Sequence, residues 1–227
     1  MGTNVANTLI LAGCYLALFT LGELLYHVFK VKAEITRKLV HAGTGLLALL
    51  FPLLLDNHWW VLFLCASFGV ILICSLRFGL LKSINAIDRK SVGSLAYPVA
   101  VYGCYLSYSY QGHQYIYYYL PIMVLAISDP LAALSGKKWP WRPYRIAGAT
   151  KTILGSLVFF MSAFLIVLFS WRYVNLSSLA IAHVWASAFT ALLATLAEAV
   201  SSDGYDNVSI PLTVIVSLFL ISSWISL

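Results

Sequence analysis

Long apolar runs constrain this chain more than any other feature of its sequence. They fall near residues 5 to 29, 38 to 55, 59 to 77, 95 to 110, 114 to 134, 152 to 170, 179 to 200 and 207 to 226. A transmembrane helix needs about 20 mostly apolar residues, and an unpaired peptide group in hydrocarbon costs several kcal/mol, so runs of this length are expected to be helices. The sequence therefore predicts an all-α, polytopic membrane bundle of about seven to eight transmembrane helices, with residues 1–227 as one integral membrane domain.

The composition excludes an ordinary water-soluble protein. Hydrophobic residues make up 61% of the chain and charged residues only 10%, whereas soluble domains are about half apolar and about a quarter charged. The first run lacks a basic leader and contains Glu23 and His27, so we expect a retained helix and not a cleaved signal. The cysteines have no paired spacing, which favours small buried residues over a disulfide framework or a zinc site. They are Cys14, Cys65, Cys74 and Cys104.

The basic residues are distributed unevenly among the connections between these runs. If the runs alternate in direction, 13 of the 14 Lys and Arg residues lie on one side of the membrane, and only Arg172 lies on the other. The positive-inside rule makes that side the cytoplasm and places both termini outside. This topology explains the formal charge of +6, so we do not expect nucleic acid as a partner.

Asp129 lies within an apolar run, in the segment IMVLAISDPLAALSGKKWP. It is about 15 residues into its expected helix, or roughly 22 Å at 1.5 Å per residue, and thus still below the inner surface. An ionisable group at that depth is by default a functional-site hypothesis. Pro130 suits the first turn of a new helix capped by Ser128 or Asp129, so the helix is expected to break there. Gly136, followed by Lys137, would then let a phosphate approach the main chain. The alternative is a proline kink with a hydrogen-bonded aspartate.

A second cluster occupies EITRKLVHAGTG, residues 34 to 45. In a helix, Glu34, Arg37 or Lys38, and His41 recur at intervals of three and four and share one face. Arginine offers a forked donor for phosphate oxygens, lysine a compact charge, and histidine a proton or a hydrogen bond. Alone, the segment also fits a basic flank with one buried histidine. Together with Asp129, it predicts one wall of a site.

Two further junctions combine a cation, hydroxyl groups and a glycine just before an apolar run. DRKSVGSLAYP, residues 88 to 98, contributes Arg89 and Ser91, and KTILGS, residues 151 to 156, contributes Lys151 and Thr152. Helix N-terminal amides beside a cation suit an anionic ligand. The same residue types are common in ordinary loops before helices, so neither junction identifies a site by itself.

Acidic residues collect in the stretch TLAEAVSSDGYDNVSIPL, residues 195 to 212. Glu198 ends one expected helix, and Asp206 and Asn207 precede the next. Mg²⁺ typically keeps waters and takes one or two carboxylates plus phosphate oxygens. We therefore expect Glu198 and Asp206, together with Asp129, to hold a magnesium ion that carries a nucleotide, and Asp203 to lie in a solvated turn.

Five segments occur in a fixed order along the chain: RKLVHAGTG, RKSVGSLAYP, SDPLAALSGKK, KTILGS and ATLAEAVSSDGYDNVSIPL. In order and spacing, this series resembles the polyprenol kinase family, which includes phytol kinase, dolichol kinase and the CTP-dependent diacylglycerol kinases. The similarity extends from about Glu34 to Pro211. One position departs from the family pattern, since Leu154 stands where relatives often have an acidic residue before the glycine.

The resemblance implies a multi-pass membrane enzyme with its active site on the cytoplasmic face. It implies transfer of the terminal phosphate of CTP to the hydroxyl of a lipid alcohol, with a divalent cation such as Mg²⁺. The lipid classes that it allows are polyprenol, phytol, dolichol and diacylglycerol. Two alternatives remain open, namely a membrane cytidylyltransferase that acts on phosphatidate and CTP, and a lipid transporter or binding protein without catalysis.

Residue chemistry assigns roles within that reaction, because phosphoryl transfer needs cations on the phosphates and a group that positions the attacking hydroxyl. We expect Asp129 or His41 near the lipid hydroxyl, and cations on the phosphates. The residues predicted to bind the nucleotide are Arg37, Lys38, Arg89, Ser91, Gly136, Lys137, Lys151, Thr152 and Asn207. The predicted metal ligands are Asp129, Glu198 and Asp206.

Overall fold

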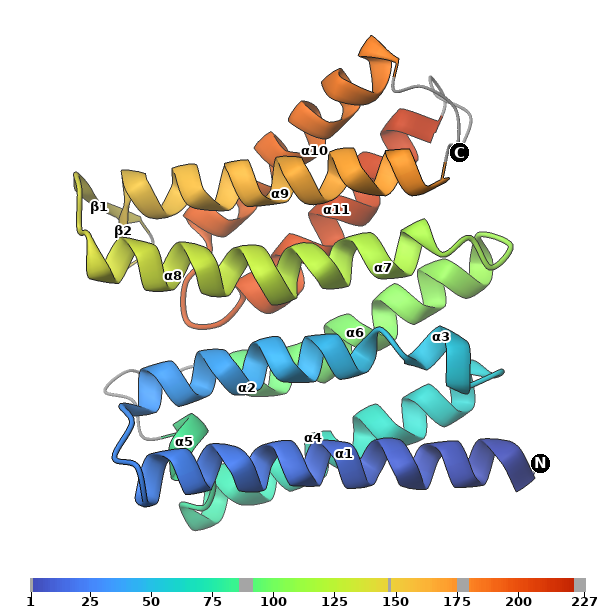
Figure 1. Cartoon of the computed structure of the whole chain (residues 1–227), viewed down its shortest axis with the longest axis vertical. Helices are drawn as coiled ribbons and strands as arrows, with labels where there is room; N and C mark the ends of the chain where they lie inside the picture. Colours follow the sequence, from blue (N-terminus) through green and yellow to red (C-terminus); the bar gives the residue numbers. More distant parts are fainter. Residues whose placement is uncertain (1, 86–91, 147, 175–179, 223–227) are drawn as a thin grey trace.

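Helices make up most of the described chain (Figure 1). The computed structural model describes residues 2–85, 92–146, 148–174 and 180–222, without the side chains of residues 172–174. Its elements are α1 Gly2–His27, α2 Ala33–Ala48, α3 Phe51–Leu54, α4 His58–Phe78, α5 Lys82–Asn85, α6 Gly93–Tyr110, α7 Ile116–Met123, the π-helical turn η1 Val124–Ser128, α8 Asp129–Lys138, β1 Pro143–Ile146, β2 Ala149–Thr152, α9 Ile153–Val174, α10 Ile181–Val200 and α11 Asp206–Ser222. Apart from the short β1–β2 hairpin, the predicted all-α architecture is confirmed for the described residues.

Six segments of the described chain are long and apolar enough, by length and composition, to cross a membrane. They are Gly2–His27, Ala33–Leu54, His58–Phe78, Ile116–Lys138, Ile153–Trp171 and Ile181–Val200. The protein is therefore a multi-pass membrane protein, but the predicted count of seven to eight spans is not confirmed. The other two predicted spans correspond to α6, which is rich in tyrosine and serine, and to α11, which has 17 residues. Both helices still pack within the bundle, α6 against α4 and α11, and α11 against α10.

The connections that carry most of the charge gather at one end of the bundle, on the left in Figure 1. This charged end contains the α1–α2 turn, α5, the β1–β2 hairpin and the α10–α11 loop, whereas the N-terminus and α3 lie at the opposite end. The arrangement follows from the alternating direction of the long helices. The acidic and basic segments singled out from the sequence therefore meet at one end, although they are far apart along the chain.

The helix that contains Asp129 does not break. α7, η1 and α8 follow one another without interruption, Ser128 and Asp129 both have helical backbone angles, and Ser128 makes no side-chain cap to α8. The predicted break and cap are therefore wrong. Pro130 has no amide proton, and its ring crowds the preceding turn of an α-helix. The wider turn of η1 accommodates this defect within a continuous helix.

Small residues let the helices approach closely beside Asp129. A Cβ atom on Gly45 of α2 would lie 2.3 Å from the Ala126 Cβ in η1. A Cβ atom on Gly136 of α8 would lie 2.5 Å from Thr152 Oγ1 at the start of α9. Small side chains at such contacts are typical of helix packing in membranes, where close van der Waals contact holds the helices together. Gly45 thus lets α2 pack against η1, and Gly136 lets α8 pack against the start of α9.

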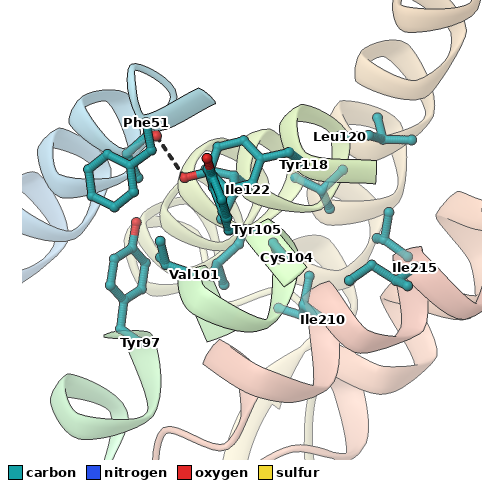
Figure 2. Packing of buried hydrophobic residues seen from close by; sticks show 14 of the residues in the cluster. Phe51, Tyr97, Val101, Cys104, Tyr105, Tyr118, Leu120, Ile122, Ile210 and Ile215 are labelled. Carbon is teal, nitrogen blue, oxygen red and sulfur yellow. Dashed lines mark hydrogen bonds between the residues drawn. The ribbon is translucent and has the colours of Figure 1, made fainter. Parts of the chain in front are cut away.

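A buried aromatic layer fixes the helices further from the charged end (Figure 2). The Tyr118 hydroxyl in α7 donates a hydrogen bond to the Ala48 carbonyl oxygen at 2.7 Å, and the Tyr105 hydroxyl in α6 donates to the Leu55 carbonyl oxygen at 2.6 Å. Each bond satisfies a backbone oxygen at the end of α2 or α3, and such a bond is worth about 0.5–1.5 kcal/mol. Together they hold the α2–α3 segment against α6 and α7.

Candidate active site

Asp129 is buried at the start of α8, where α8 faces α2. Its Oδ2 accepts a hydrogen bond from Lys38 Nζ at 2.5 Å and lies 3.7 Å from His41 Nε2. Only 6% of the Asp129 side chain is exposed, compared with 15% for Lys38 and 12% for His41. A buried carboxylate requires a charged or hydrogen-bonded partner, and Lys38 provides it. The α2 face that was inferred from residues 34 to 45 therefore contacts Asp129.

The starts of α6 and α11 meet α2 at Gly93. Asn207 Nδ2 donates a hydrogen bond to the Gly93 carbonyl oxygen at 2.7 Å, and the Asn207 backbone amide donates to Asp206 Oδ1 at 3.0 Å. A Cβ atom on Gly93 would lie 2.8 Å from Asn207 Nδ2 and 3.0 Å from Arg37 Nη2. The absence of a side chain at Gly93 therefore lets Asn207 and the Arg37 guanidinium approach the same stretch of backbone.

The β1–β2 hairpin, which the sequence did not predict, positions Lys151 over the end of α10. The strands are antiparallel, with Tyr144 opposite Lys151. Lys151 Nζ donates to Glu198 Oε1 at 2.6 Å and also contacts the Glu198 carbonyl oxygen. The Tyr144 hydroxyl shares a hydrogen bond with Ser156 Oγ at 2.7 Å, and burial raises the pKa of this phenol above its ordinary value. The tight reversal places Gly148 at a φ of +81°, which glycine adopts without strain.

The carboxylates and cations of the site form one array, which contains both charge signs. Asp206 and Glu198 each interact electrostatically with Asp129 and with one another. Lys38 and Lys151 both interact electrostatically with Asp206. The Glu198 Oε2 atom is buried and has no hydrogen-bond partner. Within residues 2–85, 92–146, 148–174 and 180–222, no three His, Cys, Asp or Glu side chains already form a group that could hold a metal ion.

Some of the residues predicted from the sequence lie away from this array. Lys137 forms an exposed ion pair with Glu34, whose side chain is 47% exposed, and such surface pairs contribute roughly 0–1 kcal/mol. Gly136 is buried against α9, so helix packing explains the glycine, and Thr152 Oγ1 accepts a hydrogen bond from the Gly155 amide at 3.0 Å. The predicted helix break that would have exposed the main chain at Gly136 is absent. Two further predicted residues, Arg89 and Ser91, lie outside the described residues.

A cavity of about 90 Å³ lies beside Asp129 and reaches α1, α2, α4 and α6. Its walls differ chemically. The polar wall contains Arg37, Lys38, His41, Ser94, Asp129, Asp206 and Asn207. The apolar wall includes Tyr15, Phe19, Leu64, Cys65, Phe68 and Leu72. The cavity can therefore accept a polar group at one side and an apolar chain at the other.

Sequence reasoning singled out the junction at residues 88 to 98, which includes the start of α6, but it missed Tyr97 and the buried face of α6 that lines this cavity. Tyr97 is buried where the two walls meet, and its ring centroid lies 5.0 Å from that of His41. Gly93, Tyr97, Val101 and Cys104 are buried at intervals of three and four along α6, the spacing of one helix face. That spacing was available in the sequence and was the signal that could have identified Tyr97.

The fold and this site define a class of protein: a multi-pass helical membrane protein whose charged cluster adjoins an apolar cavity at one end of the bundle. The chain is 31% identical over 207 residues to a phytol kinase of Synechocystis sp., and the match covers 89% of this chain and 86% of that relative. The chain therefore belongs to the polyprenol kinase family, as the five segments indicated. No protein-family model matches the chain, and no solved structure matches it.

Proposed function

We propose that this protein is a lipid alcohol kinase that transfers the terminal phosphate of CTP to the hydroxyl of a membrane lipid. The observation that carries the proposal is the position of Asp129, buried between the cations of α2 and a cavity with one apolar wall. A carboxylate in that position can meet a nucleotide on its polar side and a lipid hydroxyl on the other. The similarity to a phytol kinase supports the reaction class, and CTP is the donor that the family resemblance implies.

The cations of the site suit a triphosphate. Phosphoryl transfer requires neutralisation of phosphate charge and positioning of the nucleophile, with little covalent chemistry from the protein. Arg37, Lys38 and Lys151 supply three positive charges, of which Lys38 and Lys151 contact buried carboxylates. When a triphosphate binds, these lysines exchange carboxylate oxygens for phosphate oxygens. The carboxylates then become available to a metal ion.

The residues present fit a magnesium ion that arrives with the nucleotide. Because Mg²⁺ keeps several waters and takes one or two carboxylates plus phosphate oxygens, it does not require a complete cluster of protein ligands. Asp129 and Asp206 both line the cavity, and Glu198 Oε2 is a buried oxygen without a hydrogen-bond partner. We assign these three residues to the ion, which would supply positive charge against the phosphate oxygens.

Asp129 or His41 positions the lipid hydroxyl. The hydroxyl oxygen bonds to the terminal phosphorus, the bond from that phosphorus to the bridging oxygen breaks, and CDP leaves with the bonding electrons. The hydroxyl proton passes to the carboxylate or to the imidazole and then to water. The two groups lie 3.7 Å apart, so either can act as the proton acceptor for a hydroxyl held between them.

The two substrates reach this site from different phases. The excess of Lys and Arg at the charged end supports a cytoplasmic orientation by the positive-inside rule. CTP then arrives from the cytosol, and the lipid alcohol arrives from the bilayer. This arrangement explains why the charged cluster lies at the end of the bundle and not at its centre.

The reaction is tested with purified protein, Mg²⁺ and CTP labelled at either the γ or the α phosphorus. The acceptors are phytol, farnesol, dolichol, diacylglycerol and phosphatidate. Label that enters the lipid from the γ position supports the kinase. Label from the α position instead supports a cytidylyltransferase, and lipid binding without transfer of either label supports a non-catalytic protein.

A matched pair of substitutions tests the central role of Asp129. Asp129→Asn removes the buried charge and is expected to leave almost no kinase activity. Asp203→Asn changes an exposed acid in the α10–α11 loop whose φ of +54° asparagine readily adopts, and it is expected to retain wild-type activity. Retention of most activity by Asp129→Asn would remove this residue from the reaction centre.

A further inference from the structure

The apolar side of the cavity extends away from the charged end toward the middle of the bundle. Along α4, the lining residues run from Leu72 to Leu64, about 12 Å at 1.5 Å per residue. Tyr97 and Val101 of α6 face Phe51 across this region (Figure 2). A chain that starts at Asp129 and follows the apolar wall therefore travels along α4 and α6 toward Phe51.

Four aromatic rings cluster along this path, with Phe68 midway between Leu72 and Leu64 and Phe51 of α3 at its far end. The Tyr15 ring centroid lies 4.7 Å from that of Phe68 and 6.1 Å from that of Phe51, and Phe19 packs edge-on against Phe68 at 5.8 Å. Each of the four side chains is buried and lines the cavity. The Tyr15 hydroxyl donates a hydrogen bond to the Thr44 carbonyl oxygen at 3.1 Å, so its ring is held in place.

The size of the cavity makes this aromatic cluster the limiting feature. Its volume of about 90 Å³ accommodates about three water-sized groups at about 30 Å³ each. That is enough for the hydroxyl end and the first part of a lipid chain. A longer chain meets the rings of Tyr15, Phe51 and Phe68.

We propose that Phe68, packed against Tyr15 and Phe19, limits the length of the lipid alcohol that the site accepts. The inference rests on the proposed kinase function and adds to it the residues that select the substrate. Phe68 comes from α4, which contributes no charged residue to the polar wall. A change in this ring is therefore expected to alter selection among alcohols and not the handling of CTP.

Chain-length selection is measured as the ratio of kcat/KM for geranylgeraniol to kcat/KM for geraniol. Because a hydrophobic pocket discriminates single methylene groups by roughly 10–200-fold, Phe68→Ala is expected to raise this ratio about tenfold or more, with the KM for CTP unchanged. Leu64→Phe, which fills the path one helical turn beyond Phe68, is expected to lower it. Phe68→Leu is the milder variant if Phe68→Ala does not fold.

Phe63→Ala is the matched control, because Phe63 lies on α4 but is 59% exposed on its outer face. Equal ratios in folded Phe68 and Phe63 variants would overturn the proposal.

A binding measurement separates this proposal from the proposed reaction. A geraniol analogue with a diazirine at the far end of its chain, short enough for the wild-type path, is irradiated with the protein in the absence of nucleotide. Crosslinks at Tyr15, Phe51 or Phe68 that unlabelled alcohol suppresses support the proposal, even if the protein transfers no phosphate and the kinase function fails. Crosslinks confined to outward-facing positions such as Phe63 refute it, even if the kinase reaction is observed.

Discussion

Single and double substitutions can separate what the Lys38–Asp129 ion pair contributes to stability from what Asp129 contributes to catalysis. The two charged atoms are 2.5 Å apart, and their side chains are 15% and 6% exposed. Removal of one partner from a buried pair costs about 3–5 kcal/mol, because the other charge remains in a poorly solvating environment. Lys38→Met leaves the Asp129 carboxylate in this position and is therefore expected to destabilise the protein by that amount.

The measurement is thermal unfolding of the purified protein in detergent, followed by circular dichroism. At about 2–4 °C per kcal/mol for a chain of this size, Lys38→Met is expected to lower Tm by roughly 6–20 °C. Asp129→Asn is expected to lower Tm less, because Lys38 also interacts electrostatically with Asp206. The double variant Lys38→Met/Asp129→Asn leaves neither charge and is expected to recover most of the stability lost by Lys38→Met.

Kinase activity is expected to follow a different pattern in the same three variants. If Asp129 holds the metal and the hydroxyl, the double variant remains inactive although its Tm is restored. Additive losses of Tm in the double variant would show that the two residues are not coupled, and the pair would not exist as described. Recovery of activity together with stability would show that Asp129 matters only for folding.

Three further outcomes are expected. Lys151→Met removes the partner of Glu198 and one of the cations assigned to the phosphates of CTP. It should therefore raise the KM for CTP more than it lowers kcat, as measured by initial rates at saturating lipid alcohol. An unchanged KM would place Lys151 outside the nucleotide site. Gly45→Ala would place a Cβ 2.3 Å from Ala126 Cβ and overpack the α2–η1 contact, which costs about 1–3 kcal/mol. At about 2–4 °C per kcal/mol, Tm should fall by roughly 2–12 °C. Gly103→Ala, with no neighbouring atom within 4 Å, should leave Tm unchanged or raise it, and equal effects of the two substitutions would contradict the packing. Chelation of divalent cations should abolish phosphate transfer, and Mg²⁺ should restore it, whereas transfer that persists after chelation would exclude the metal role.

The helical membrane fold was largely predictable from the sequence. A run of apolar residues long enough to cross hydrocarbon must satisfy its own backbone hydrogen bonds, so length and hydropathy identified the α-helices without knowledge of their neighbours. The number of spans was harder to predict from the sequence, because α6 contains many tyrosine and serine residues. Their hydroxyl groups are tolerated within a membrane only where neighbouring helices shield them from lipid. Burial of this kind is a property of the bundle and not of the segment.

The Asp129 segment shows where local rules were insufficient. An aspartate followed by proline is a common helix start, and the sequence accordingly predicted a break. In the structure, a π-helical turn at Val124–Ser128 accommodates Pro130, and the helix continues. The choice between a break and a wider turn depends on packing against α2 and α9, which contact η1. Helical spacing, in contrast, correctly placed Lys38 and His41 on one face toward Asp129.

The sequence by itself determined that the chain forms apolar helices and that most of its acids and cations fall at one end of them, because both follow from local hydropathy and alternation across a bilayer. Only the tertiary structure decided which charges pair. Lys38 contacts Asp129 across 91 positions of sequence, and Lys151 reaches Glu198 through a hairpin. The structure likewise revealed the cavity, since its wall combines single faces of α1, α2, α4 and α6. Side-chain contacts between distant segments depend on how the helices are oriented about one another, and no local sequence pattern encodes that orientation.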